Sequence, residues 1–305
     1  MLKRFLIYLS SAKWAQRLIT RWGVARRVAM RFVAGENLSD AVSAVQELNT
    51  AGLQAALDFL GENTTNEAEI QEASTHLMEV IDAIHQYQLH AYLSIKLSQL
   101  GLLLSADLCE QALFRILDQA RLRGIFVRID MEDSSLTENT LIIFEHALQK
   151  GYSNVGIVLQ AYLYRTEQDL QRLSRINAKI RLVKGAYNEP SSVAFPDLEA
   201  VNANFDRLAE KLLEISKAAG NPQASPDGLT PPMVAIGTHS TSHIDAVIDL
   251  MRILGIPSHA VEFQFLYGIR RELQRSLVLQ GYPVRVYTPF GTHWYPYLMR
   301  RLAER

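Results

Sequence analysis

Short apolar runs recur along the chain and alternate with longer amphipathic segments. The runs are rich in Val, Ile, Leu and aromatic residues and lie at 53–62, 89–98, 125–132, 154–162, 179–187, 233–239, 259–268 and 282–291. Between them, segments such as 66–87 and 105–124 place apolar residues three and four positions apart, as an amphipathic helix does. Strands that alternate with helices predict parallel pairing through crossover helices.

The number and spacing of these units predict one large α/β domain. Eight strand and helix units within about 250 residues are typical of a (β/α)8 barrel, also called a TIM barrel. The chain has 305 residues, of which 48% are hydrophobic, enough for a core of that size. We therefore expect the barrel to occupy residues 51–305 and a set of N-terminal helices to occupy residues 1–50.

Charge and cysteine content exclude several classes of protein. The formal net charge is -1, so no overall basic excess indicates nucleic-acid binding. Cys109 is the only cysteine, which excludes an internal disulfide, a zinc ribbon and an iron–sulfur cluster. No apolar run approaches the roughly 20 residues that span a bilayer.

The first 35 residues are basic and precede the first acidic residue, Glu36. This pattern fits a helix lying on an anionic membrane surface. It also fits a helix packed on the domain with a solvated basic side, and some mitochondrial presequences look similar. A non-catalytic, membrane-bound scaffold is therefore one function class that the segment leaves open.

Polar residues gather where the predicted strands end. Active sites of (β/α)8 barrels lie at the carboxyl ends of the strands. In chain order, these ends carry Glu62, Lys96, Asp130 with Glu132, Gln160 with Arg165, Lys184 with Tyr187, Thr238 with His239, Glu262 with Gln264, and Tyr287. A single such residue is more often a satisfied core or rim group, but a polar residue at each of the strand ends favours a site.

Known motifs narrow the chemistry of that site. The sequence contains no G-x-G-x-x-G, no G-x-x-x-x-G-K-[ST] and no G-x-S-x-G pattern, so it supports no Rossmann site, P-loop or hydrolase elbow. His239 and His243 have the spacing of a helical metal pair, but the accompanying glutamate of H-E-x-x-H is missing. Lys184 remains a candidate Schiff-base lysine, as in barrel aldolases.

The chain ends on a helical pattern that contains two adjacent arginines. Tyr297, Arg300, Arg301 and Glu304 lie three and four positions apart, so they share a helix face. Two guanidinium groups on one face can clamp an anion. They are also typical of surface charge near a helix C-terminus, where the helix dipole favours cations.

Taken together, the ordered motifs resemble those of flavin-dependent proline dehydrogenases of the small monofunctional bacterial type. The motifs are "DMEDS" from 130, "LQAYLYRT" from 159, "RLVKGAY" from 181, "GTH" from 237, "EFQFLYG" from 262 and the terminal Y-x-x-R-R-x-x-E. The resemblance implies a distorted barrel that holds FAD across its C-terminal face and oxidises L-proline to 1-pyrroline-5-carboxylate. It also implies hydride transfer to flavin N5, a membrane quinone as electron acceptor, and a cytoplasmic protein on the inner face of the cell membrane.

The resemblance assigns roles to individual residues, and it implies no metal. It implies a catalytic set of Lys96, Asp130, Tyr287, Arg300 and Arg301. The substrate pocket would be formed by Lys96, Tyr187, Leu266, Tyr287, Arg300, Arg301 and Glu62, and the cofactor segments would contribute Asp130, Gln160, Arg165, Arg181, Lys184, Gly185, Ala186, Thr238, His239 and Gln264. Tyr287 resembles the proline-specific enzymes rather than those for hydroxyproline. If the arginines bind substrate, the last helix lies over the C-terminal face, with Arg300 near Glu62.

Overall fold

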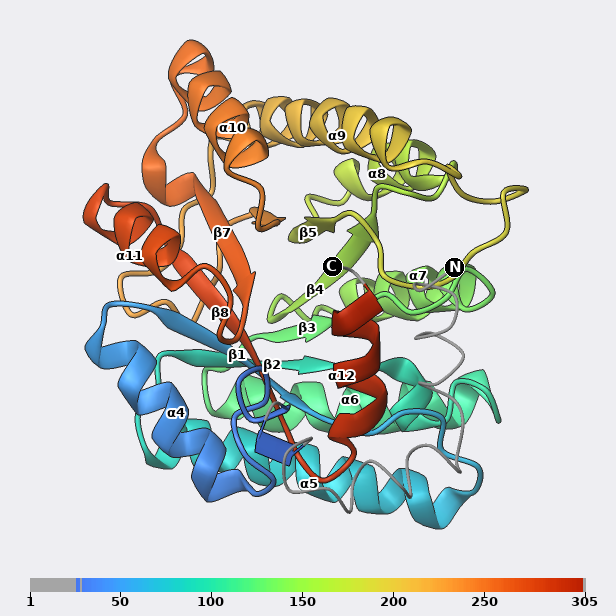
Figure 1. Cartoon of the computed structure of the whole chain (residues 1–305). Helices are drawn as coiled ribbons and strands as arrows, with labels where there is room; N and C mark the ends of the chain where they lie inside the picture. Colours follow the sequence, from blue (N-terminus) through green and yellow to red (C-terminus); the bar gives the residue numbers. More distant parts are fainter. Residues whose placement is uncertain (1–25, 28, 304–305) are drawn as a thin grey trace.

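A closed barrel of parallel strands forms the centre of the molecule. The computed structural model describes residues 26–27 and 29–303. Each strand pairs with the next in sequence, and the last pairs with the first (Figure 1). The strands are β1 (Gln54–Phe59), β2 (Ala91–Ile95), β3 (Val127–Ile129), β4 (Val155–Gln160), β5 (Ile180–Val183), β6 (Val234–Gly237), β7 (Val261–Leu266) and β8 (Val284–Phe290). Each predicted run contains one strand, so the predicted barrel is confirmed.

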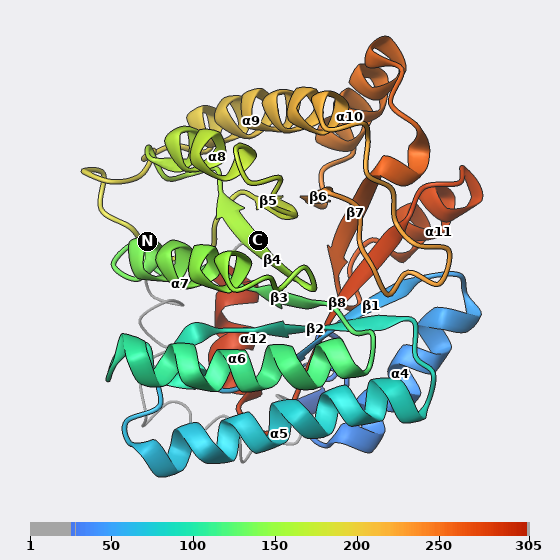
Figure 2. The same cartoon turned by 180° about the vertical axis from the view of Figure 1, so that it is seen from behind.

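Amphipathic helices surround the strands, as Figure 2 shows from behind. They are α4 (Leu38–Thr50), α5 (Glu67–Gln86), α6 (Ala106–Leu122), α7 (Thr137–Gln149), α8 (Thr166–Ser174), α9 (Leu198–Ala218), α10 (Thr241–Leu254) and α11 (Arg271–Leu279). The short 3-10 turns are η1 (Leu97–Leu100) and η2 (Ser258–Ala260), and the last helix, α12 (Trp294–Ala303), follows β8. Several helices begin at a side-chain cap. Asn66, for example, accepts a hydrogen bond from the Glu69 N–H at 3.0 Å and so fixes the first turn of α5.

The last helix lies over the mouth of the barrel rather than outside it. The outer wall at β1 and β8 is covered by α4, which packs against both strands. In α12, Arg300 contacts Glu62, which follows β1, and lies over the ring of Tyr187, which follows β5 on the opposite side of the barrel. The predicted position of the last helix is confirmed.

An apolar cluster holds α12 in this position. Trp294 and Leu298 of α12 are buried together with Ala29, Phe32 and Leu60. The indole N–H of Trp294 also donates to a Glu36 carboxylate oxygen at 3.0 Å. The segment just before α4 therefore packs against α12 and holds it across the mouth of the barrel.

The barrel interior is polar to an unusual degree. The Gln264 amide donates to the Tyr92 hydroxyl at 2.9 Å, across the barrel from β7 to β2. Deeper in the barrel, Arg285 and Glu262 are both fully buried and pair at 2.9 Å. We expected Glu262 at a strand end, but it is the second residue of β7 and belongs to this internal ion pair. A buried charge of this kind is stable only when it is paired.

The N-terminal predictions fall largely outside the described residues. Residues 1–25, which carry most of the basic pattern, are not described. Of the helices that the structure does describe, none combines the length and apolarity required to cross a membrane.

Candidate active site

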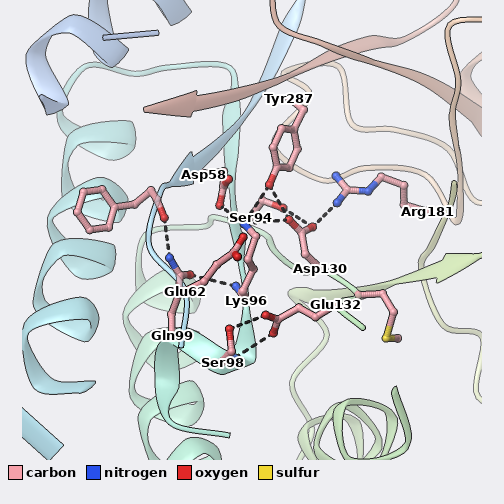
Figure 3. Close-up of polar contacts among 12 residues, drawn as sticks. Asp58, Glu62, Ser94, Lys96, Ser98, Gln99, Asp130, Glu132, Arg181 and Tyr287 are labelled. Atoms are coloured by element: carbon pink, nitrogen blue, oxygen red, sulfur yellow. Dashed lines mark hydrogen bonds and ion pairs between the residues drawn. The ribbon is translucent and has the colours of Figure 1, made fainter. Parts of the chain in front are cut away.

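A lysine and two aspartates meet inside the barrel, below its mouth. Lys96 follows β2, and its ammonium group lies 2.8 Å from an Asp58 oxygen and 3.9 Å from an Asp130 oxygen (Figure 3). Burial alone would lower the pKa of Lys96, but the charges of Asp58 and Asp130 more than compensate, so that its pKa is raised. Lys96 is therefore a fixed cation at neutral pH.

Asp130 joins this lysine to a second cation. It accepts hydrogen bonds from the Ser94 hydroxyl at 2.8 Å and from the Tyr287 hydroxyl at 2.7 Å, and Arg181 donates to it from β5. The Arg181 guanidinium also lies over the Tyr287 ring. Four of the predicted site residues thus form one connected network with Asp58, and burial raises the pKa of the Tyr287 hydroxyl, which stays protonated.

Gln264 supports this network from below. Its carbonyl oxygen accepts from Arg181 at 3.1 Å, and its amide donates to Glu262 at 2.6 Å. Gln264, a predicted cofactor residue, therefore holds Arg181 in place.

The mouth of the barrel carries an ion pair between α12 and the loop after β1. Arg300 donates from both terminal nitrogens to Glu62, at 3.0 and 2.5 Å, and only a small part of either side chain is exposed. A bidentate pair fixes the orientation of both groups. The predicted proximity of Arg300 and Glu62 is confirmed, and Tyr187 lies beside the arginine.

The neighbouring arginine, Arg301, lies over the ring of Tyr297 one turn earlier on α12. The charge of Arg301 acts on His239, whose pKa falls to about 4, chiefly because the ring is buried. His239 Nε2 accepts a hydrogen bond from the Leu266 N–H at 3.1 Å, so the neutral ring carries its proton on Nδ1. His239, a predicted cofactor residue, is therefore neutral and bonded to the backbone of β7.

The histidines do not form a metal site. His243 lies on α10 and contacts Asp206 through Nδ1 at 2.5 Å, away from the bond between His239 and Leu266. Within the described ranges, no cluster of three or more His, Cys, Asp or Glu side chains is placed to hold a metal ion. The zinc interpretation therefore has no support from these two residues.

The segment after β5 contains three of the predicted cofactor residues, Lys184, Gly185 and Ala186. Gly185 has a φ of +116°, and a Cβ there would lie 2.3 Å from the Tyr162 ring, so only glycine fits. Next to it, the Lys184 ammonium donates to Asn202 on α9 at 2.6 Å, and partial burial lowers its pKa. Ala186 follows in the same partly exposed loop.

Three further predicted residues have different surroundings. The side-chain oxygen of Gln160 at the end of β4 is buried and, among the described residues, has no hydrogen-bond partner. Thr238 is buried at the end of β6 and caps the Ser240 N–H at 3.2 Å. Arg165 lies at the start of α8, where it donates to Asp169 at 2.8 Å and also pairs with Glu138, so two carboxylates already engage its guanidinium.

Sequence analysis missed residues that the site requires. Asp58 is an acidic residue inside an apolar strand, two positions after Ala56 on the same face, and this alternation could have identified it. Ser94, Ser98 and Gln99 carry no comparable signal, because small and amide side chains are common on any strand end. Glu132 was recognised only as a polar strand end.

The fold and the site together define a barrel enzyme with a buried network of paired charges and an arginine-bearing helix across its mouth. A family model described as proline dehydrogenase matches residues 41–305. The chain therefore belongs to the proline dehydrogenase family.

Individual relatives extend this result along the whole chain. Proline dehydrogenase 1 of Bacillus subtilis (strain 168) is 38% identical over 100% of this chain and 95% of its own length. Proline dehydrogenase of Deinococcus radiodurans is 40% identical over 91% of this chain and 86% of its own length.

A solved structure shares the fold. The chain superimposes with a TM-score of 0.80 on proline utilization A (PutA) from Bdellovibrio bacteriovorus inactivated by N-propargylglycine, at 25% identity over 92% of this chain. It spans only 33% of that longer protein.

Proposed function

We propose that this chain oxidises L-proline to 1-pyrroline-5-carboxylate with FAD as cofactor. The observation that carries the proposal is the position of α12 across the mouth of the barrel, where Arg300 is bound to Glu62 and lies over Tyr187, above the buried network of Lys96, Asp130 and Tyr287. Proline has one carboxylate, one ring nitrogen and an apolar ring. A paired guanidinium site above a compact, closed pocket suits such a ligand.

Each part of the pocket has a task in this proposal. Arg300 and Arg301 bind the substrate carboxylate and so orient a ligand that has few other polar groups. Leu266, Tyr187 and Tyr287 form walls for the apolar ring. Since α12 covers the mouth, the same helix that binds the carboxylate also excludes water from the ring.

The reaction requires little proton chemistry from the protein. Proline loses a hydride from the ring carbon next to nitrogen and a proton from the nitrogen, and a C=N bond forms. If the neutral amine reacts, its nitrogen lone pair assists departure of the hydride, and no strong base is needed. Lys96 is unsuited to be that base, because Asp58 and Asp130 keep it protonated.

The residues after β4, β5 and β6 fit the proposed cofactor. FAD, when bound, supplies the hydride acceptor. Gln160 offers a buried acceptor oxygen without a partner in the described part of the chain, and Gly185 lets the backbone approach without a side chain. Arg181 and Lys184 would supply positive charge to a bound group that gains electrons, and the neutral ring of His239 would offer its Nδ1–H as a donor. Thr238, Ala186 and Arg165 stay predicted cofactor contacts.

We further propose that a membrane quinone accepts the electrons and that the protein lies on the inner face of the cell membrane. The support is the basic character of residues 1–35, of which the first 25 are not described. Binding of the full chain to anionic vesicles, compared with neutral vesicles, tests this proposal, and equal binding to both contradicts it.

The direct test of the reaction is the product. Purified protein with FAD, L-proline and a quinone analogue should form 1-pyrroline-5-carboxylate, which gives a coloured adduct with o-aminobenzaldehyde. Absence of this product contradicts the proposal. The Schiff-base alternative at Lys184 has the lowered pKa of this lysine in its favour. Borohydride trapping of a carbonyl substrate on Lys184 would support that alternative.

A further inference from the structure

On its C-terminal side, the loop that carries Glu62 is bonded to a serine of the turn after β2. Ser98, in the turn η1 after β2, accepts at its carbonyl from the Thr64 N–H at 3.2 Å and the Thr64 hydroxyl at 3.1 Å. Its own hydroxyl lies 3.4 Å from the Asn63 N–H. Asn63 has a φ of +60°, in the left-handed region that asparagine adopts more readily than most residues, so the chain turns sharply here. The backbone on the C-terminal side of Glu62 thus depends on where Ser98 lies.

Ser98 is in turn fixed by Glu132 from the end of β3. The Ser98 N–H donates to one carboxylate oxygen at 3.0 Å and its hydroxyl donates to the other at 2.5 Å. Both side chains are buried, and Figure 3 shows them facing each other below Lys96. A carboxylate that accepts from a backbone N–H and the hydroxyl of the same residue leaves that residue little freedom to move.

The same turn is bonded to the first strand. The Gln99 amide donates to the Phe59 carbonyl at 2.6 Å, and its oxygen accepts from the Lys96 N–H at 3.1 Å. The turn therefore joins the ends of β1 and β2, and Glu132 ties it to β3. Movement of the turn would shift the loop at 60–66 relative to α12.

The carboxyl group of Glu132 is buried at a cost that the proposed reaction does not explain. Burial raises its pKa to about 7, against the opposing effect of the Ser98 hydrogen bonds and the Lys96 charge, while Glu62 adds to the rise. Its charge also reaches the Tyr187 hydroxyl from the loop after β5 and the Cys109 thiol from α6. Neither oxidation nor carboxylate binding requires a carboxyl group at this position.

We propose that Glu132 is a positioning residue that acts through Ser98: the pair holds the loop at 60–66 so that Glu62 meets Arg300 and closes α12 over the substrate. The inference rests on the proposed function only for the identity of that substrate. Glu132 is not a catalytic residue in this account, since its hydrogen bonds go to the turn. Loss of the pair should loosen the loop and weaken substrate binding without slowing the chemical step.

The chain offers a matched control for this test. Ser134 donates to Glu189 from its N–H at 2.7 Å and from its hydroxyl at 2.5 Å, which repeats the same arrangement between the loops after β3 and β5. Ser98→Ala and Glu132→Gln test the proposed pair, and Ser134→Ala and Glu189→Gln remove equivalent bonds that do not contact the loop at 60–66.

Two measurements are compared among these variants. Hydrogen exchange followed by mass spectrometry should show about tenfold faster exchange of the peptide containing residues 60–66 in Ser98→Ala and Glu132→Gln, as expected for the loss of one buried hydrogen bond. The KM for L-proline should rise roughly five- to tenfold while kcat changes less than twofold, the pattern of lost ground-state binding. The control variants should leave exchange at 60–66 unchanged.

Unchanged exchange at 60–66 in both test variants overturns the inference. Faster exchange at 60–66 with an unchanged KM for L-proline also overturns it. So does an equally large increase of exchange at 60–66 in the control variants. If the wild-type chain does not turn over L-proline, the proposed function fails, but the exchange result still decides whether Glu132 and Ser98 hold the loop. If Ser98→Ala does not fold, Glu132→Gln, which keeps the shape of the side chain, decides alone.

Discussion

The Lys96–Asp58 pair yields the most quantitative prediction. Asp58→Asn keeps the shape of a fully buried side chain but removes the charge 2.8 Å from the Lys96 ammonium. Asp130 is the remaining carboxylate, at 3.9 Å. Breaking a buried ion pair costs about 3–5 kcal/mol because the other charge is left uncompensated. Since Asp130 compensates in part, we expect a loss of about 3 kcal/mol in the free energy of unfolding.

The sign of the pH dependence follows from Lys96. The pKa of Lys96 is raised in the folded protein, so its stabilising contribution is fully present at neutral pH and is lost only as the pH rises through the folded pKa. The pKa of Asp58 is raised too, chiefly by burial, so ionisation of Asp58 itself offsets part of this stabilisation. Urea denaturation at pH 7, followed by circular dichroism, measures the effect without interference from this titration. For a domain of this size the same loss should lower Tm by about 6–12 °C.

Two further variants identify the cause. Asp58→Asn combined with Lys96→Met removes both charges and should regain much of the lost stability. Asp82→Asn removes a half-exposed carboxylate that lies 3.2 Å from Arg123 and should cost less than about 1 kcal/mol. The explanation is refuted if Asp58→Asn is as stable as Asp82→Asn, or if Lys96→Met makes the single variant less stable rather than more.

The remaining predictions concern the last helix, α12, the cofactor, the pH dependence of stability and the N-terminus. Replacing Arg301 by Ala should raise the KM for L-proline by at least tenfold, and steady-state kinetics with an unchanged KM would contradict a carboxylate clamp. Gly185→Ala should reduce the FAD content of purified protein, measured by absorbance, because the added Cβ meets Tyr162; full occupancy would argue against a cradle. Burial raises the pKa of Glu132 to about 7, so the protonated form is favoured in the folded state. The contribution of this group to the free energy of unfolding should therefore fall by about 3 kcal/mol as the pH rises from about 4.5 to about 8. Glu132→Gln should abolish this part of the pH dependence of stability, and an identical pH dependence in both proteins would contradict the prediction. Deletion of residues 1–25 should weaken binding to anionic vesicles while FAD content persists, and unchanged binding in a flotation assay would exclude this segment as the membrane contact.

The boundary of that deletion is itself a result of the structure. In the sequence, the basic pattern extends over residues 1–35. Phe32 and Val33 are buried against α12, so a deletion through residue 35 would expose the apolar face of that helix. A change in activity would then report lost packing rather than lost membrane contact.

The barrel could be predicted because each strand carries a strong local signal. Buried parallel strands are apolar on both faces, and runs such as 154–162 and 233–239 show this directly. The place of α12 could not be predicted from periodicity, because an amphipathic helix packs equally well outside the barrel or across its mouth. Only the demand that Arg300 and Arg301 reach a substrate indicated the mouth, and that demand came from the family resemblance.

The site could be predicted in part for a similar reason. Lys96 and Asp130 stand out because charged residues in apolar runs require partners, whereas Arg181 was assigned only through the family resemblance. The same argument applies to Asp58, which was overlooked because Glu62 was taken as the polar residue of the first run. Ser98 and Gln99 act through backbone hydrogen bonds between loops distant in sequence, and no local pattern encodes which loops will meet.

The most direct test of the central claim is anaerobic titration of the purified protein with L-proline while the visible absorbance is recorded. The account predicts a yellow protein whose flavin absorbance bleaches on addition of L-proline, and an Arg301→Ala variant that bleaches only at higher proline concentration. A protein that remains colourless after incubation with FAD, or a flavin that stays oxidised in excess L-proline, would contradict it.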